Sequence, residues 1–241
     1  MANDIDIGLF SINTDHLVDA EALSTVAMAA EEAGFESVWT AEHVVLPDPQ
    51  MPPSPLPPDA ELLDPTVALG YVAAVTTRIK LATGIIILPQ RNPLVLAKEL
   101  ASVDVLSNGR MLFGVGVGYL EPEFDAIGIP MEDRGRRTTE YIEAMRSIWN
   151  DEDPAYEGDY VSFAGVKAFP RPIQPLGPPV IMGGHSIPAW RRSVTHSQGW
   201  YGFMLDPEAT SANLAGLSEA NQKYERPSEL GQLEITVTPR M

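Results

Sequence analysis

Apolar segments of two periodicities alternate along this chain. A short apolar run at residues 5–10 is followed by residues 20–34, where apolar side chains recur at helical spacing and Gly34 ends the pattern. The same order of strand and helix repeats to the end of the sequence. The expected strands cover residues 5–10, 37–40, 79–88, 111–117, 180–182, 200–205 and 233–238, and the expected helices residues 20–34, 65–76, 93–106, 134–149, 188–196 and 207–224. This alternation predicts an α/β fold with a parallel sheet.

The expected elements are one helix and one strand short of a TIM-type (β/α)8 barrel. We therefore predict a single α/β-barrel domain over residues 1–241 that lacks the last helix and strand. The first and seventh strands would then have unpaired apolar edges, a state that proteins avoid by pairing or covering them. The sequence accordingly predicts a homodimer contact at these edges, or a truncated chain that is unstable as a monomer.

Two segments interrupt the alternation, at about residues 44–64 and 150–179. The first is rich in proline, which cannot continue a helix or a central strand, and it leaves the carboxyl end of the second strand. In the second we expect a hairpin, with strands at residues 156–163 and 166–169 around Ala164-Gly165. Long ordered loops above a barrel often form the lid of a ligand site, and both segments are candidates for that role.

Composition and charge narrow the possible functions. Hydrophobic residues make up 44% of the chain and charged residues 20%, as in an ordinary globular protein. The net charge of −17 repels nucleic acid and acidic membrane surfaces, so neither is an expected partner. The chain has no cysteine, and its histidines lack the spacing of a metal site. We expect a cytoplasmic protein without a metal centre, whose redox chemistry would need a bound cofactor.

Residues at the carboxyl ends of the strands are candidates for chemistry, because the active sites of parallel barrels lie there. After the second strand, Glu42 and His43 place an ionisable pair at the mouth, suited to acid–base catalysis near neutral pH. The alternative is a hydrogen-bonded loop histidine. After the third strand, Asn92 before Pro93 is typical of a helix N-cap, and Arg91 either neutralises an anion or is solvated.

Glycines mark the ends of the fourth and fifth strands. The alternation Gly114-Val-Gly-Val-Gly118 leaves one strand face without side chains, which suits either a flat ligand or close packing of a neighbouring side chain. Met182-Gly-Gly-His-Ser186 directly precedes a helix and predicts either a phosphate-binding turn or a plain turn capped by the serine. The arginines at 134, 136 and 137 open the helix expected at residues 134–149, where positive side chains oppose the helix dipole. They either bind an external anion or pair with Asp133, Glu132 and Glu140 on a solvated face.

Three motifs together resemble the luciferase-like monooxygenase superfamily, and in particular its deazaflavin-dependent branch. They are Val38-Trp-Thr-Ala-Glu-His43, the stretch from Ala82 through Asn108-Gly-Arg110 to Gly118, and Met182-Gly-Gly-His-Ser186. The likeness runs from residue 5 to residue 240 in consistent order and includes Glu123-Phe, Arg134-Gly-Arg-Arg137 and Tyr141. It implies a barrel that binds FMN or the deazaflavin coenzyme F-420 at the carboxyl ends of the strands.

The resemblance also implies a role for each motif. His43 matches a histidine that faces the cofactor ring, and Gly84-Ile85 falls where relatives often have a cis peptide bond behind that ring. The positions that match backbone contacts to the cofactor are Gly116, Val117 and Gly118, and those that match the phosphate-binding turn are Gly183, Gly184, His185 and Ser186.

Two departures from the family pattern bear on the reaction. Sugar-phosphate dehydrogenases of the deazaflavin branch carry an acid where this chain has Tyr119, which speaks against that particular reaction. Luciferases have an arginine for the FMN phosphate where this chain has Val117, which favours F-420 over FMN.

Three hypotheses follow. The first is an oxidoreductase that transfers a hydride between F-420 and a small organic substrate, with His43 and Glu42 as the catalytic residues. The second is an FMN-dependent monooxygenase that receives reduced flavin from a separate reductase and activates oxygen. The third is a catalytically silent flavin-binding protein, suggested by the missing eighth strand.

Overall fold

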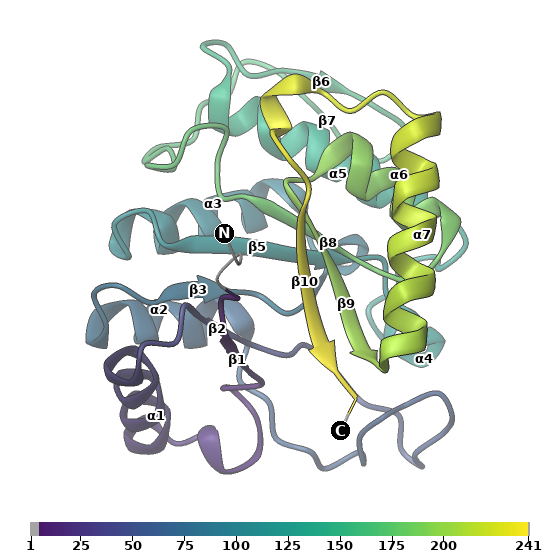
Figure 1. The fold of residues 1–241 in the computed structure, drawn as a ribbon. Coiled ribbons are helices and arrows are strands. Elements are labelled where there is room, and N and C mark those ends of the chain that lie inside the picture. Colours follow the sequence, from purple (N-terminus) through teal and green to yellow (C-terminus); the bar gives the residue numbers. More distant parts are fainter. Residues whose placement is uncertain (1–4, 241) are drawn as a thin grey trace.

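The strands form a parallel sheet that is nearly closed into a barrel (Figure 1). A computed structural model describes residues 5–240. Neighbouring strands follow the order β1-β2-β3-β5-β8-β9-β10, and β4 also pairs with β5. The bounds are β1 Gly8–Phe10, β2 Ser37–Trp39, β3 Lys80–Ala82, β4 Ile86–Ile87, β5 Met111–Gly116, β8 Val180–Gly183, β9 Gly199–Leu205 and β10 Glu234–Pro239. Within residues 5–240, β1 and β10 each pair on one side only, which confirms the predicted barrel with one strand missing. The homodimer stays a prediction.

Helices pack around the outside of the sheet, as Figure 1 shows. Their bounds are α1 Ala20–Ala33, α2 Pro65–Val75, α3 Pro93–Leu106, α4 Glu121–Ala126, α5 Arg134–Asn150, α6 Ile187–His196 and α7 Pro207–Lys223. Local capping explains several starts: Asp64 and Asn92 each accept two first-turn N–H groups, and a proline follows each. The expected helices are confirmed, whereas the short α4 was not predicted. Within the described residues, none of the helices has the length and apolar character needed to cross a membrane.

Two apolar layers hold most of the barrel, and a third cluster lies between β9 and α7. The larger lies between the strands and the helices around them, and includes Leu81, Leu100 and Phe113, each fully buried. The smaller fills the inside of the barrel, where Trp39 and Tyr201 meet Phe10 and Ile85. Because side chains alternate along a strand, β2, β3, β5 and β8 contribute to both layers. The interior of the barrel is packed rather than open.

Two expectations need correction. The strand expected at residues 79–88 is divided into β3 and β4, with residues 83–85 between them. The expected strand at 166–169 is absent, and the hairpin is instead formed by β6, Tyr156–Glu157, and β7, Ser162–Phe163. The Glu140 carboxylate of α5 accepts the N–H groups of residues 159, 160 and 161. This long-range contact fixes the hairpin turn at 158–161, ahead of the Ala164-Gly165 pair.

Candidate active site

His43 lies just beyond the carboxyl end of β2, with its imidazole against a buried carboxylate. The ring Nδ1 is 3.4 Å from Oε2 of Glu123, and Oε1 of Glu123 accepts the N–H of Val44 at 2.6 Å. The Glu123 side chain is fully buried and that of His43 is 8% exposed. With Nδ1 turned to Glu123, Nε2 is the ring atom left for a ligand. The carboxylate thus fixes both the ring and the loop that carries it.

Tyr119 borders the same histidine. Its ring meets the edge of the His43 ring, with 6.1 Å between the ring centres. The side chain is about half-exposed, so the phenol can reach solvent or a ligand. Burial raises the pKa of Tyr119, and the negative charge of Glu123 raises it further. Tyr119 therefore keeps its proton and can act as a hydrogen-bond donor beside His43.

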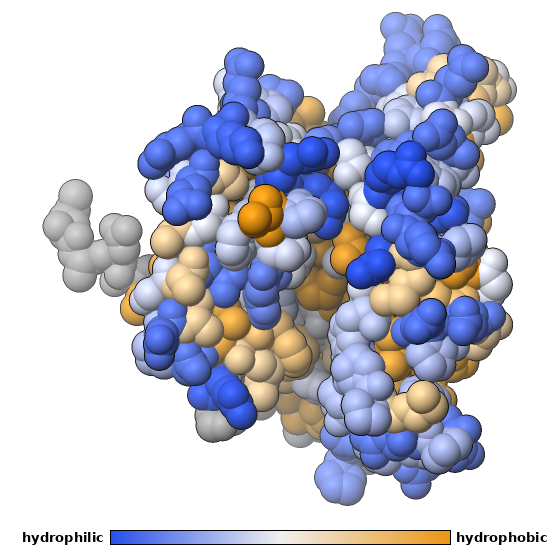
Figure 2. Space-filling view, turned by 90° about the vertical axis from the view of Figure 1, so that its right-hand side faces the viewer, coloured by the Kyte–Doolittle hydropathy of each residue, from blue (hydrophilic) through white to orange (hydrophobic). Residues whose placement is uncertain are grey.

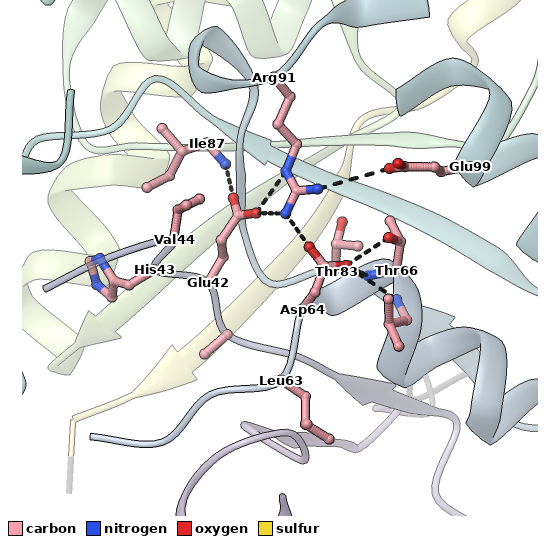
Figure 3. A network of polar contacts seen from close by, with 12 residues as sticks. Glu42, His43, Val44, Leu63, Asp64, Thr66, Thr83, Ile87, Arg91 and Glu99 are labelled. Carbon is pink, nitrogen blue, oxygen red and sulfur yellow. Dashed lines mark hydrogen bonds and ion pairs between the residues drawn. The ribbon is translucent and has the colours of Figure 1, made fainter. Parts of the chain in front are cut away.

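Glu42, which precedes His43, belongs to a buried ion-pair network instead of the open mouth (Figure 3). Its carboxylate accepts hydrogen bonds from the Arg91 guanidinium and from the N–H of Ile87. Arg91 also donates to Asp64 at 2.7 Å and lies 3.8 Å from Glu99. The Glu42 side chain is only 2% exposed. Both carboxylate oxygens are thus occupied by partners from the segment after β3.

The charges of this network stabilise one another. Burial raises the pKa of Glu42, while Arg91 and the Ile87 N–H act in the opposite direction. Burial also raises the pKa of Asp64, but hydrogen bonds from Thr66 and Arg91 outweigh it and the net shift is downward. Arg91 stays protonated, because Glu42 and Asp64 more than offset the effect of burial on its pKa. The network ties the end of β2 to the start of α2 and to residues 84–92.

Gly84 and Ile85 are joined by a cis peptide bond, as the resemblance predicts. A Cβ on Gly84 would lie 2.7 Å from the carbonyl oxygen of Thr40, so this turn packs directly on the end of β2. The Ile85 side chain extends across the barrel interior: a Cβ on Gly116 would lie 2.9 Å from it, and one on Gly183 3.0 Å. The bare glycine face of β5 therefore packs against Ile85. This agrees with the second interpretation of the motif, close packing of a neighbouring side chain.

The turn at residues 183–186 joins β8 to α6. Gly184 has φ +122°, a conformation that side chains disfavour, and Ser186 precedes α6 without capping it through its hydroxyl. The N–H groups at the start of α6 are thus left without a side-chain cap. His185 accepts the N–H of Phe203 through Nε2 at 3.1 Å, and burial lowers its pKa, so its ring is the neutral acceptor.

The predicted cofactor positions after β5 lie at the same mouth. Residues 116–118 are half-buried, and Gly118 has φ +78°. Arg134 at the start of α5 donates from Nε to the Gly118 carbonyl at 3.2 Å and so holds this loop. The neighbouring Arg136 pairs with Asp133 at 2.6 Å in solvent, as in the solvated alternative, whereas Arg134 and Arg137 are partly buried. Contacts of these positions with a cofactor stay a prediction.

A groove with an apolar floor opens on the side of the molecule where α4, α6 and α7 lie (Figure 2). His43 and the 183–186 turn lie at the carboxyl ends of β2 and β8, the end of a parallel barrel where active sites are found. The strands place His43, the cis turn and the glycine turn at the carboxyl ends of β2, β3 and β8, whereas Glu42 lies in the buried network. The roles of these residues stay predictions. Glu123 was missed as a site residue, and the Glu-Phe pair in the family motif was the signal for it.

The model of the family described as luciferase-like monooxygenase matches residues 9–240. The chain belongs to this family. An uncharacterised protein of Mycobacterium tuberculosis is 35% identical over 185 residues, which are 73% of this chain and 66% of that protein. The F-420-dependent tetrahydromethanopterin reductase of Methanopyrus kandleri has the same fold, with a TM-score of 0.77 at 20% identity over 97% of this chain and 65% of that one.

Relatives of known activity use two different cofactors. The F-420-dependent glucose-6-phosphate dehydrogenase of Amycolatopsis mediterranei is 32% identical over 66% of this luciferase-like chain and 46% of its own length. The FMNH2-dependent dimethylsulfone monooxygenase of Pseudomonas fluorescens is 31% identical over 73% of this chain and 46% of its own. The chain spans about two thirds of the mycobacterial relative and under half of these two enzymes. Family membership thus identifies an oxidoreductase class and leaves the cofactor open.

Proposed function

We propose that the protein transfers a hydride between the deazaflavin coenzyme F-420 and a small organic substrate. The observation that carries this proposal is the His43 imidazole, held by the fully buried Glu123 carboxylate at the end of β2. An alcohol that becomes a carbonyl must release a proton as well as a hydride, and a fixed imidazole at the mouth can take that proton. The substrate and the cofactor are the expected small-molecule partners.

The residues at the mouth fit such a cofactor. The 183–186 turn presents N–H groups at the start of α6 with no side-chain cap, which suits a phosphate. The half-buried backbone of residues 116–118 and the side chain of Ile85 offer an apolar surface for a flat ring. Val117 places no charge where FMN-binding luciferases have an arginine, which favours F-420 over FMN.

Each residue at the mouth has a distinct task in this reaction. F-420, when bound, supplies a ring carbon that accepts or donates the hydride. His43 Nε2 takes the hydroxyl proton during oxidation and returns it to the carbonyl oxygen during reduction. Glu123 stabilises the imidazolium that forms, since it is an anion 3.4 Å from Nδ1. Tyr119 keeps its proton and can donate a hydrogen bond to the substrate oxygen.

Glu42 takes a different role in this proposal from the one expected for it. Its carboxylate is occupied by Arg91 and the Ile87 N–H, and its side chain is almost fully buried. It therefore positions His43 and the 84–87 turn and does not exchange protons with a substrate.

The second candidate is an FMN-dependent monooxygenase that obtains reduced flavin from a separate reductase. The relationship to the Pseudomonas fluorescens enzyme favours it. Titration of the purified protein with F-420 and with FMN, followed by fluorescence, separates the two. We expect binding of F-420 in the micromolar range, reduction of F-420 by members of a panel of alcohols, and oxidation of reduced F-420 by members of a panel of enones and aldehydes. Tight FMN binding with none for F-420 would overturn the preference.

A further inference from the structure

One wall of the barrel mouth is built from stacked aromatic rings. Trp39 of β2 and Tyr201 of β9 stack with 5.2 Å between ring centres and 14° between ring planes. Phe203, two residues further along β9, lies 6.3 Å from Tyr201 and 5.4 Å from Phe10 of β1. Tyr201 and Trp39 are buried, whereas Phe203 is 44% exposed. The rings form a continuous cluster, here called the aromatic wall, in which Trp39, Tyr201 and Phe203 stack and Phe10 is tilted against Phe203.

The polar atoms of the aromatic wall are satisfied within the protein. Trp39 Nε1 donates to the Ser37 hydroxyl at 2.8 Å, and the Tyr201 hydroxyl bonds to that of Thr238 at 2.6 Å. A ligand at this wall therefore meets ring faces and edges and no free donor or acceptor of these residues. Such a surface gains most from a flat apolar group, because aromatic pairs add to the free energy of apolar burial.

The position of Phe203 is linked to the predicted phosphate turn. Its N–H donates to Nε2 of His185, which is possible only while that ring nitrogen is unprotonated. Met204, the next residue, has φ +54°, so the strand turns sharply directly after Phe203. The aromatic ring at the mouth is thus fixed by the same turn that is proposed to hold the cofactor.

The charges near His43 disfavour an anionic substrate. Arg91 is the cation of the segment after β4, and Glu42, Asp64 and Glu99 already surround it. On the other side of the imidazole lies the buried anion Glu123. An anionic group beside His43 would therefore meet a like charge and no free guanidinium from this network.

We propose that the substrate is an uncharged alcohol or carbonyl compound that carries an aromatic or conjugated group, and that this group stacks on Phe203. This inference rests on the proposed function, since it assigns the reacting oxygen to His43. Phe203 determines specificity here and takes no part in the proton transfer.

Benzyl alcohol, 2-propanol and glucose 6-phosphate are the probes for a test on the full chain. Binding of each is measured by calorimetry without turnover, and steady-state rates are measured with F-420. We expect Phe203→Ala to raise the Kd and the KM of benzyl alcohol about tenfold, with kcat nearly unchanged. Phe203→Tyr, which keeps the ring, retains the affinity of the parent protein. The values for 2-propanol stay unchanged in both variants.

Phe169→Ala is the matched control, because Phe169 is a 63% exposed phenylalanine whose carbonyl accepts a hydrogen bond from Lys98 of α3, in the outer layer of helices. It leaves benzyl alcohol binding unaltered. The inference is overturned if Phe203→Ala binds benzyl alcohol as the parent does, or if glucose 6-phosphate is the tightest-binding probe. Should the binding pattern hold while no probe is oxidised with F-420, the aromatic site stands and the hydride-transfer proposal fails.

Discussion

The two ends of the barrel differ in how fully their polar side chains are hydrogen-bonded. At the amino end, Glu31 of α1 accepts the backbone N–H groups of Thr77, Arg78 and Ile79. In the same region the Arg110 guanidinium donates to the carbonyls of residues 73, 76, 79 and 107. Glu31 and Arg110 thus hold the loops between helices and strands in place. Their charged groups are hydrogen-bonded mainly to backbone atoms of these loops.

The carboxyl end leaves polar groups without partners. Among the described residues, the buried side-chain atoms without a hydrogen bond are Thr40 Oγ1, both amide atoms of Gln90, Arg137 Nε and Arg192 Nε. Thr40 directly follows β2, Gln90 follows β4, and Arg137 and Arg192 lie in the first two turns of α5 and α6. Buried polar groups are usually satisfied, so this difference between the two ends supports the proposal of a ligand site at the carboxyl end.

Replacement of His43 tests this division most strongly. His43→Ala removes the proton acceptor at the mouth and is expected to lower kcat by about 10²–10⁴-fold, as for the loss of a general base. Because the ring makes one long contact to Glu123, the midpoint of urea unfolding should stay close to that of the parent. Activity with F-420 and circular dichroism in urea are the two measurements. A loss of stability in proportion to activity would contradict the functional assignment.

Replacement of Arg91 tests whether some charged residues at the carboxyl end serve only to stabilise the fold. Arg91→Met leaves the buried Glu42 without its counter-ion and should lower the free energy of unfolding by about 3–5 kcal/mol. The double variant Glu42→Met/Arg91→Met should recover much of this loss, since no unpaired charge is then buried. Arg136→Met is the control: its exposed pair with Asp133 should contribute under about 1 kcal/mol. Equal losses for Arg91→Met and Arg136→Met would contradict the network.

The elements with local signals could be predicted from the sequence, and those set by distant contacts could not. Asn92-Pro93 defines the start of α3 because the cap and its targets lie within three residues. The hairpin was misplaced because its turn is held by Glu140, about twenty residues away. α4 was missed because six residues are too few to show a period.

The candidate site divides in the same way. His43 and the glycine turns could be assigned from strand ends and family motifs, since both are local in sequence. The role of Glu42 depends on Arg91, 49 residues further on, and that of Glu123 on a histidine 80 residues before it. Nothing in the spacing of a single sequence reports such pairs, because only the folded sheet brings the ends of β2, β4 and β5 together.

Glu123→Gln has a smaller expected effect than loss of the histidine. The amide oxygen can still accept the Val44 N–H, so the loop keeps its position, but the imidazole loses its anionic partner. We expect kcat to fall about tenfold with KM nearly unchanged, because the change acts on the charge that develops during proton transfer. A rise in KM at constant kcat would instead assign Glu123 to the shape of the substrate site.

Replacement of Glu31 at the amino end is expected to have the smallest effect. It should change the stability of the protein and leave its activity unaltered. Burial acts to raise its pKa, but the N–H groups of Ile79, Arg78 and Thr77 prevail and lower it to about 2, from an ordinary value of 4.5. Because the pKa is lower in the folded state, the carboxylate stabilises the fold fully above about pH 4.5, and this contribution is lost as the pH falls towards 2.

Glu31→Gln should therefore cost about 1 kcal/mol at pH 7, a modest value because water screens this surface group, and the cost should shrink progressively below pH 4.5. Urea unfolding at a series of pH values measures it, with the exposed neighbour Glu32→Gln as the control. Turnover per folded molecule at pH 7 should not change in either variant. If Glu31→Gln instead lowered kcat while leaving stability intact, the amino end would share in function and the contrast between the two ends of the barrel would fail.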